Sequence, residues 1–139
     1  MTIEELNNNV QAFNLQNELD KIIIEVSPEL VDANTEMLYS GIDAEGKSLG
    51  QYAPRTIEYK EKKGQPTDRI TLKDTGEYYA GKEVVKTGDD YTIISTDPKN
   101  DKLVIDFGIE IDSIDKNRMG EITDDQLSPK LTDALQKVL

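Results

Sequence analysis

The chain has 139 residues, with 16 basic and 28 acidic side chains, a formal charge of -12 and a pI near 4.4. This length suits one domain with a modest aliphatic core, and the acidity opposes binding to nucleic acid or to an anionic membrane, because both need clustered Lys and Arg. The absence of cysteine excludes disulfides and thiolate metal sites and fits synthesis in a reducing cytoplasm.

Helices are predicted at the N-terminal end of the chain. Thr2 and Glu5 have the spacing of a capping box. Apolar residues then recur at helical intervals, first at Ile3, Leu6, Val10 and Phe13, and again at Leu15, Leu19, Ile22, Ile23 and Val26. Ser27 and Pro28 are expected to end or kink this second stripe, with Ser27 capping a further helix that Gly41 stops.

No signal peptide or membrane helix is expected. The first residues contain no basic region followed by an apolar stretch. The longest apolar run, from Ile22 to Ile24, is far shorter than the roughly 20 residues that a membrane helix requires.

Residues 42–81 are predicted to form a long irregular loop that contains one short helix, from Pro54 to Lys63, ended by Gly64. A long irregular segment in a small domain is usually functional or disordered. This one is rich in apolar and aromatic residues, namely Leu49, Tyr52, Ile57, Tyr59, Ile70, Leu72, Tyr78 and Tyr79. We expect an extended, mobile assembly loop, although the tyrosines could equally anchor it on its own domain.

The last part of the chain predicts a small antiparallel meander and a closing helix. Three strands are expected at Glu83–Lys86, Tyr91–Thr96 and Leu103–Phe107, separated by turn-rich sequences. The stretch 109–120 is ambiguous. Thr123 is expected to open an amphipathic helix that uses Leu127, Leu131, Ala134, Leu135 and Val138. The whole chain, 1–139, is therefore predicted to be a single α+β domain.

Sequence patterns for catalysis or metal binding are missing. There is no histidine, which excludes the commonest general base and His-based metal sites, and no glycine-rich phosphate loop. The tripeptide Asp106, Phe107 and Gly108 matches the metal-binding element of kinases, but no other kinase element accompanies it. Asp43 and Glu45 do not meet the spacing of a calcium loop. We predict no catalytic, cofactor-binding or metal-binding residue.

Charge is unevenly distributed along the sequence. Residues 1–46 carry ten acidic and one basic side chain, residues 47–86 carry six and nine, and residues 87–139 carry twelve and six. In an oligomer, the basic middle of one subunit could meet an acidic face of the next and steer association. The other interpretation is a solvated loop with ordinary charge scatter.

The middle of the chain carries a series of short motifs. From Gly41 to Lys60 the sequence reads GIDAEGKSLGQYAPRTIEYK, and LKDTGEYY follows at Leu72–Tyr79. This order resembles the tailed-phage virion morphogenesis proteins of the tail-completion and head-tail joining group. The matching positions are Gly46, Tyr52, Pro54, Thr56, Lys60, Leu72, Thr75 and Gly76. Phe107 with Gly108 and a closing helix extend the resemblance to residues 37–139, while the tryptophan that members often carry before the proline is absent.

The resemblance implies a structural subunit of the virion neck or tail, made in the bacterial cytoplasm, with no enzymatic activity and no cofactor. Its implied partners are copies of itself in a ring and other neck or tail proteins. DNA would pass nearby without sequence-specific binding, and no membrane would be involved. The candidate interface residues are Leu49, Tyr52, Pro54, Arg55, Thr56, Tyr59, Lys60, Lys62, Lys63, Leu72, Tyr78 and Tyr79.

Two other functions stay open at this point. The first is an acidic protein-binding module or inhibitor that mimics nucleic acid and acts on a basic partner. The second is a carboxylate-dependent or metal-dependent enzyme, which would need at least three acidic side chains converging in a pocket.

Overall fold

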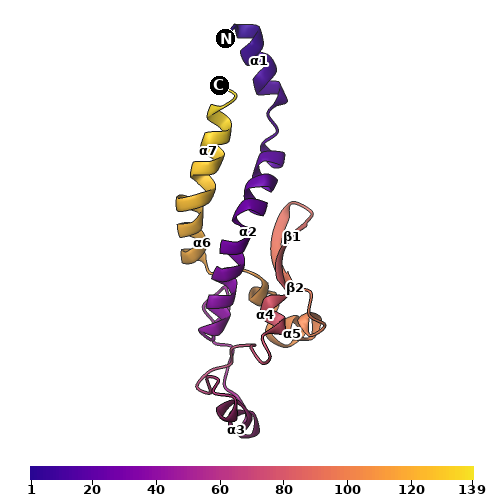
Figure 1. Cartoon of the computed structure of the whole chain (residues 1–139), viewed down its shortest axis with the longest axis vertical. Coiled ribbons are helices and arrows are strands. Elements are labelled where there is room, and N and C mark those ends of the chain that lie inside the picture. The colour runs from indigo at the N-terminus through magenta and orange to yellow at the C-terminus, as the bar shows by residue number, and fades with distance from the viewer.

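A computed structural model describes residues 1–139 and has an α+β fold, as predicted. The elements are α1 (Ile3–Ala12), α2 (Leu15–Tyr39), α3 (Pro54–Lys62), α4 (Glu77–Ala80), β1 (Lys82–Thr87), β2 (Asp90–Ser95), α5 (Asn100–Phe107), the 3-10 turn η1 (Ile109–Asp112), α6 (Lys116–Ile122), the π turn η2 (Thr123–Leu127) and α7 (Ser128–Gln136). The molecule is elongated, with α2 as its spine, α1 and both chain termini at one end and α3 at the other (Figure 1).

The two N-terminal helices have the predicted caps. The Thr2 hydroxyl accepts from the Glu5 amide at 3.1 Å, and the Glu5 carboxylate accepts from the Thr2 amide at 2.6 Å, which confirms the capping box. Asn14 caps α2 by accepting from the Asn17 amide. Only Phe13 and Asn14 separate the two helices.

Pro28 neither ends nor divides α2, which corrects the expected break at Ser27 and Pro28. The proline ring lies on the exposed side of the helix, and the Ser27 hydroxyl donates to the Ile23 carbonyl at 2.8 Å. Buried apolar residues before and after the proline, Val26 and Leu30 among them, pack into one core, which keeps the helix continuous through it. The helix ends where Gly41 takes a left-handed φ of 83°, as expected.

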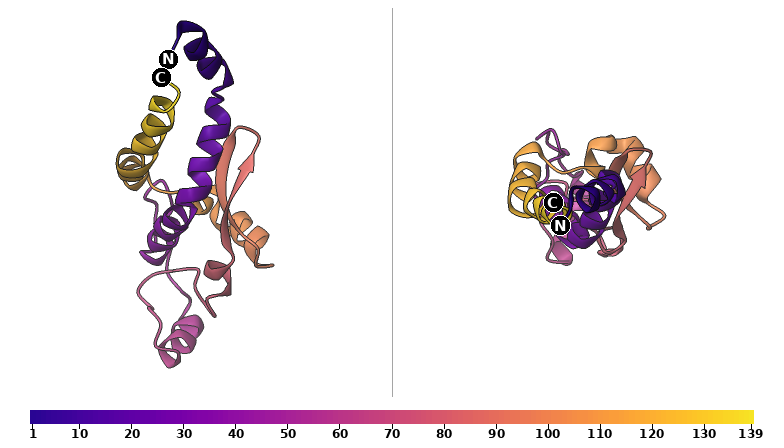
Figure 2. Two further views of the ribbon diagram at one scale, coloured as in Figure 1. Left: turned by 45° about the horizontal axis from the view of Figure 1, so that its top comes forward. Right: turned by 90° about the horizontal axis from the view of Figure 1, so that it is seen from above.

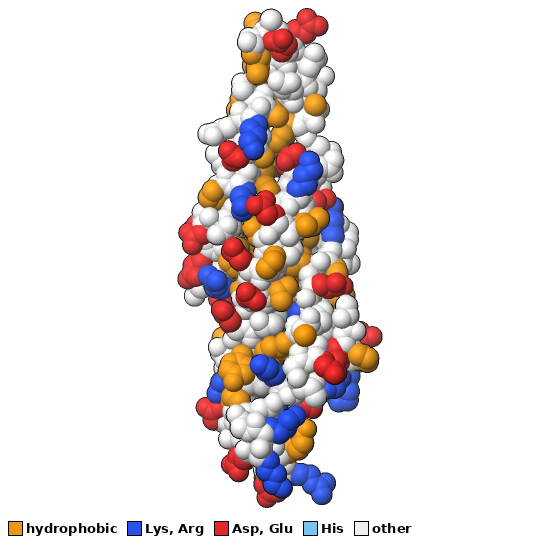
Figure 3. Space-filling model, in the orientation of Figure 1, with side chains coloured by type: hydrophobic (Ala, Val, Ile, Leu, Met, Phe, Trp, Pro, Cys, Tyr) orange, Lys and Arg blue, Asp and Glu red, His pale blue; other side chains and the backbone are white.

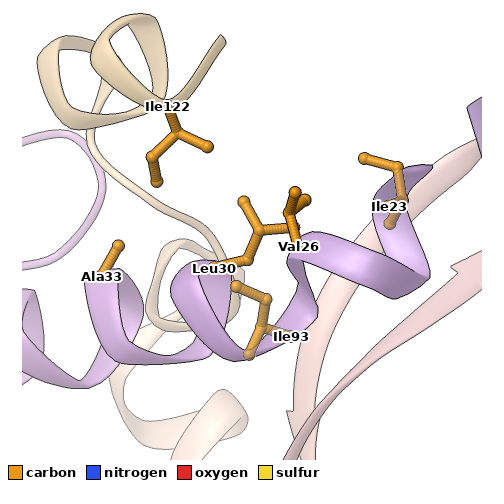
Figure 4. Packing of buried hydrophobic residues seen from close by; sticks show 6 residues of the cluster. All are labelled: Ile23, Val26, Leu30, Ala33, Ile93 and Ile122. Atoms are coloured by element: carbon orange, nitrogen blue, oxygen red, sulfur yellow. The ribbon is translucent and has the colours of Figure 1, made fainter. Parts of the chain in front are cut away.

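Two apolar clusters lie along α2. The first joins α2 to β2 and α6, and its members face one another from these three elements in Figure 4: Ile23, Val26, Leu30, Ala33, Ile93 and Ile122. The second joins the end of α2 to η1 and to both ends of residues 42–81, which we call the middle segment. It comprises Met37, Leu38, Leu49, Tyr78 and Ile111. One helix thus contributes to both clusters and connects them into one packed body.

The sheet is a two-stranded hairpin rather than a three-stranded meander. β1 pairs antiparallel with β2, and Thr87 faces Asp90 across a two-residue turn. The expected third strand is wrong, because Leu103–Phe107 lies in α5. There, Leu103 and Phe107 pack on the second cluster while Ile105 is 82% exposed, which is the periodicity of a helix. An ion pair of 2.9 Å between Lys102 and Asp106, one turn apart, adds to the helix.

The closing helix begins earlier than predicted. Asp115 caps α6 by accepting from the Arg118 amide at 3.0 Å, so the helix starts at Lys116 rather than at Thr123. It continues through the π turn η2 into α7. Pro129 lies in the first turn of α7, directly after this π turn, and it has no N–H with which to continue an α pattern.

A buried ion pair fastens the hairpin to η1. The Lys82 ammonium is wholly buried and lies 3.5 Å from Asp112, 3.3 Å from the Ile93 carbonyl and 3.4 Å from the Ile111 carbonyl. It also lies over the ring of Tyr78, 4.6 Å from its centroid. Desolvation lowers the pKa of Lys82 from 10.5 to about 8 and raises that of Asp112, in each case against the pull of the opposite charge.

The lowered pKa of Lys82 predicts a distinctive pH dependence of stability. Between pH 8 and pH 10.5 the unfolded chain holds a proton on Lys82 that the folded chain has lost. Stability therefore rises with pH in this window, by about 3 kcal/mol relative to a Lys82→Met variant. Urea unfolding of both proteins across the window checks this, and parallel pH curves would contradict it.

Candidate assembly surfaces

The first turn of the middle segment is built around a buried aspartate. The carboxylate of Asp43 accepts from the Glu45 amide at 2.9 Å and from the Lys47 amide at 3.0 Å. An isolated bridge between Ile42 and Ser48 closes the turn. These bonds use the carboxylate for the backbone turn, and no three Asp or Glu side chains in the structure are arranged to hold a metal ion.

Residues 51–76 form a lobe at the α3 end, held mainly by polar bonds (Figures 1 and 2). The Thr71 amide donates to the hydroxyl of Tyr52 at 2.9 Å, and the Tyr79 hydroxyl donates to the Thr71 carbonyl. The ammonium of Lys60 is buried under the ring of Tyr52 and donates to the Lys73 carbonyl at 2.6 Å. Specific hydrogen bonds thus hold residues 51–76 together and attach them to α4.

The surface of the lobe carries a second polar cluster. Asp74 accepts from Lys63 at 2.9 Å and from the Tyr59 hydroxyl at 3.3 Å. The hydrogen bond to Lys63 lowers the pKa of Asp74, and the same bond raises that of Lys63. This cluster joins α3 to the chain that returns toward α4.

A groove of about 490 Å³ separates the lobe from α5. Its lobe side includes Tyr59, Leu72 and Lys73, and its α5 side includes Lys99, Lys102, Leu103, Asp106 and Phe107. Leu72 is the one non-glycine residue with a left-handed φ, 58°, which is a strained backbone conformation. The groove therefore combines apolar walls with a few polar and charged groups, as binding sites do, and includes one strained residue.

The predicted interface residues divide into three groups. Leu49 and Tyr78 are buried in the second cluster and the half-buried Tyr79 packs against it, so these three anchor the middle segment on its own domain. Tyr52, Thr56, Tyr59, Lys60 and Leu72 line the groove, as does the inner edge of Tyr78. Pro54, Arg55 and Lys62 are exposed on α3 outside it, and Lys63 is tied to Asp74.

The α5 side of the groove does not follow from the predicted strand at 103–107, because a strand would place these side chains on alternating faces. A sharper signal was available in the i, i+4 pairing of Lys102 with Asp106 and of Leu103 with Phe107.

The opposite end of the molecule presents a largely exposed apolar helix face. α1 has no buried residue, although Ile3, Leu6 and Val10 recur along one side of the helix. Ile3 is 87% exposed and Val10 is 49% exposed, whereas Leu6 is half-buried, as is Phe13 just after the helix. We call Ile3, Leu6 and Val10 the α1 face. Burial of apolar area is the main stabilisation available to a helix of ten residues, so a face left bare is typical of a surface that a partner covers.

The two ends differ in charge as well as in shape. Figure 3 shows Lys and Arg side chains interspersed with Asp and Glu at the α3 end, whereas the tip of the α1 end shows acidic and hydrophobic side chains and no basic one. α1 contains Glu4 and Glu5 and no basic residue, whereas Lys73 and Lys99 beside the groove have no carboxylate partner. The ends are therefore electrostatically complementary between molecules.

Comparison with protein-family models, with curated proteins and with solved structures finds no match to this chain. None of its helices has both the length and the hydropathy needed to cross a lipid bilayer.

Lys60 is expected to stabilise the lobe that forms one wall of the groove. Lys60→Met keeps most of the aliphatic stem but leaves the Lys73 carbonyl and the Gln65 amide oxygen without their donor. We expect a loss of about 1–3 kcal/mol in unfolding free energy and faster amide exchange in 51–76. Lys62→Met, on the exposed side of the same helix, is the matched control and should change stability by less than about 0.5 kcal/mol. Equal effects of the two substitutions would contradict this role.

Proposed function

We propose that this chain is a structural subunit that assembles with copies of itself through its two ends. The α1 face carries the proposal, because Ile3 and Val10 stay exposed on one side of a helix that buries no residue in the single chain. A contact between different surfaces at opposite ends of an elongated subunit is heterologous, and such contacts generate closed rings or open filaments.

The resemblance of the middle segment to tail-completion and head-tail joining proteins favours a ring in the neck or tail of a phage particle. A net charge of -12 supports this placement, because an acidic channel lets DNA pass without retaining it. Two or more neighbours per subunit would also explain why so small a core, with only 12 buried hydrophobic residues, suffices for the chain.

The test has two parts. Sedimentation of the purified chain over a range of concentrations should show assembly into species larger than a monomer, and purified phage particles should contain the chain in several copies. A chain that stays monomeric, is absent from particles, and instead binds a basic protein in a salt-sensitive manner would contradict the proposal. That result would favour an acidic inhibitor that mimics nucleic acid.

A further inference from the structure

We infer that the groove between the lobe and α5 is the site that receives α1 of a neighbouring copy. The inference rests on the proposed function and deepens it, because it names which surface of one subunit covers the α1 face of the next. The two surfaces lie at opposite ends of the same molecule, so one chain cannot bring its own α1 to its own groove (Figure 1).

The apolar parts of the two surfaces match in kind. The α1 face presents three apolar side chains along one side of a helix, a pattern that docks into grooves of neighbouring proteins. The groove offers Leu72, Leu103 and Phe107, which are only half-buried in the free chain, and Tyr59, which is 49% exposed. Docking would bury apolar side chains on both partners that are exposed to water in the single chain.

Charge selects the groove over the other apolar surfaces. A symmetric contact between two copies of α1 would bring Glu4 and Glu5 of each chain together with no base on either helix. At the groove, lysines outnumber the two carboxylates, Asp74 and Asp106, and both of these are already paired with lysines of the same chain. Glu4 and Glu5 would there meet Lys73 and Lys99, which have no carboxylate partner within the chain. The heterologous contact therefore pairs unlike charges, whereas the symmetric one opposes like charges.

The joint before α2 suits this arrangement. Phe13 has an extended backbone, with φ -72° and ψ 117°, and with Asn14 it forms the whole connection between the two helices. α1 projects beyond the packed body instead of continuing the spine, so it is presented as a separate element to the next subunit (Figure 2).

Engineered disulfides test the contact, since the chain has no cysteine of its own. Val10→Cys marks the α1 face and Lys102→Cys marks the groove, and the two full-length proteins are mixed under mild oxidation. The matched control for the second is Lys137→Cys, another lysine with an i,i+4 carboxylate pair and nearly equal exposure, 74% against 79%. Lys137 lies at the α1 end, so a disulfide between Val10→Cys and Lys137→Cys would indicate that two copies meet through their α1 ends.

Mixed disulfides of Val10→Cys with Lys102→Cys should form roughly tenfold faster than those with Lys137→Cys, because docking raises the local thiol concentration. Equal rates for the two partners, or dominance of Val10→Cys homodimers, would overturn the inference. If the unsubstituted chain still sediments as an oligomer in that case, only the docking site is wrong. If the chain stays monomeric and is absent from particles, the proposed function fails with it.

A charge reversal provides an independent measurement. Glu4→Lys and Lys99→Glu should each weaken self-association several-fold at low salt, and both in one chain should weaken it less than the product of the two effects. Glu4 is chosen because Glu5 belongs to the capping box of α1. Independent effects at these two sites would show that the carboxylate and the ammonium do not meet, contrary to the inference.

Discussion

Asp112→Ala should cost about 3–5 kcal/mol of unfolding free energy, the largest loss that we expect from one substitution in this chain. The change leaves the Lys82 ammonium wholly buried with two carbonyls and the Tyr78 ring as its remaining partners. Without the carboxylate, the pKa of Lys82 should fall further below its present value of about 8. Urea unfolding near pH 7 measures the loss.

Two further variants make this result specific to the buried pair. Asp106→Ala removes an exposed carboxylate from a surface pair of similar length and should cost less than about 0.5 kcal/mol. Lys82→Met combined with Asp112→Ala removes both charges and should recover much of the stability, because no unpaired charge then stays buried. If Asp112→Ala alone cost less than about 1 kcal/mol, Lys82 would have to be hydrated or to lose its proton, and the carboxylate would then not be what holds the ammonium in the core.

Replacing Ile3 and Val10, the two exposed residues of the α1 face, by serine should abolish self-association while leaving the stability of the rest of the chain almost unchanged. Apolar-to-serine changes in a core are strongly destabilising, but these two side chains are 87% and 49% exposed in the single chain. We expect the free energy of unfolding to change by less than about 0.5 kcal/mol and the protein to sediment as a monomer.

The control for the α1 face is a substitution of Ile24, which is 74% exposed on α2 away from both ends. Ile24→Ser should leave both stability and self-association as they are. Loss of stability on changing the α1 face would show that α1 packs on its own chain, and continued assembly would show that another surface joins the copies.

Local signals in the sequence were sufficient for much of this fold. The capping box at Thr2, the stop at Gly41, the short helix from Pro54 and the two strands of the hairpin all depend on neighbours within a few residues, and all are present. Helix α5 was mistaken for a strand because Val104, Ile105 and Phe107 have high β propensity, and tertiary packing overrode it.

Pro28 is a second residue whose local preference is overridden by packing. Proline disfavours a helix interior locally, but the buried residues on both sides of it belong to one core and keep α2 continuous.

The candidate surfaces were only partly predictable. Aromatic and basic residues pointed to the middle segment, but only the structure separates Leu49 and Tyr78, which are buried in the core, from Tyr59 and Leu72, which line the groove. The apolar spacing of α1 was visible, but whether another element covers it depends on contacts far apart in sequence. Lys82 and Asp112 are 30 positions apart, so their pairing could not be expected from spacing either.

Both chain termini lie beside α1 (Figures 1 and 2). An affinity tag or fluorescent fusion at either end would consequently crowd the surface that we assign to the neighbouring copy, and it could turn an assembling protein into an artificial monomer. The exposed turn at Gly88 and Asp89 between the two strands lies away from both ends and is the better place for a label, since insertions at exposed turns perturb folding least.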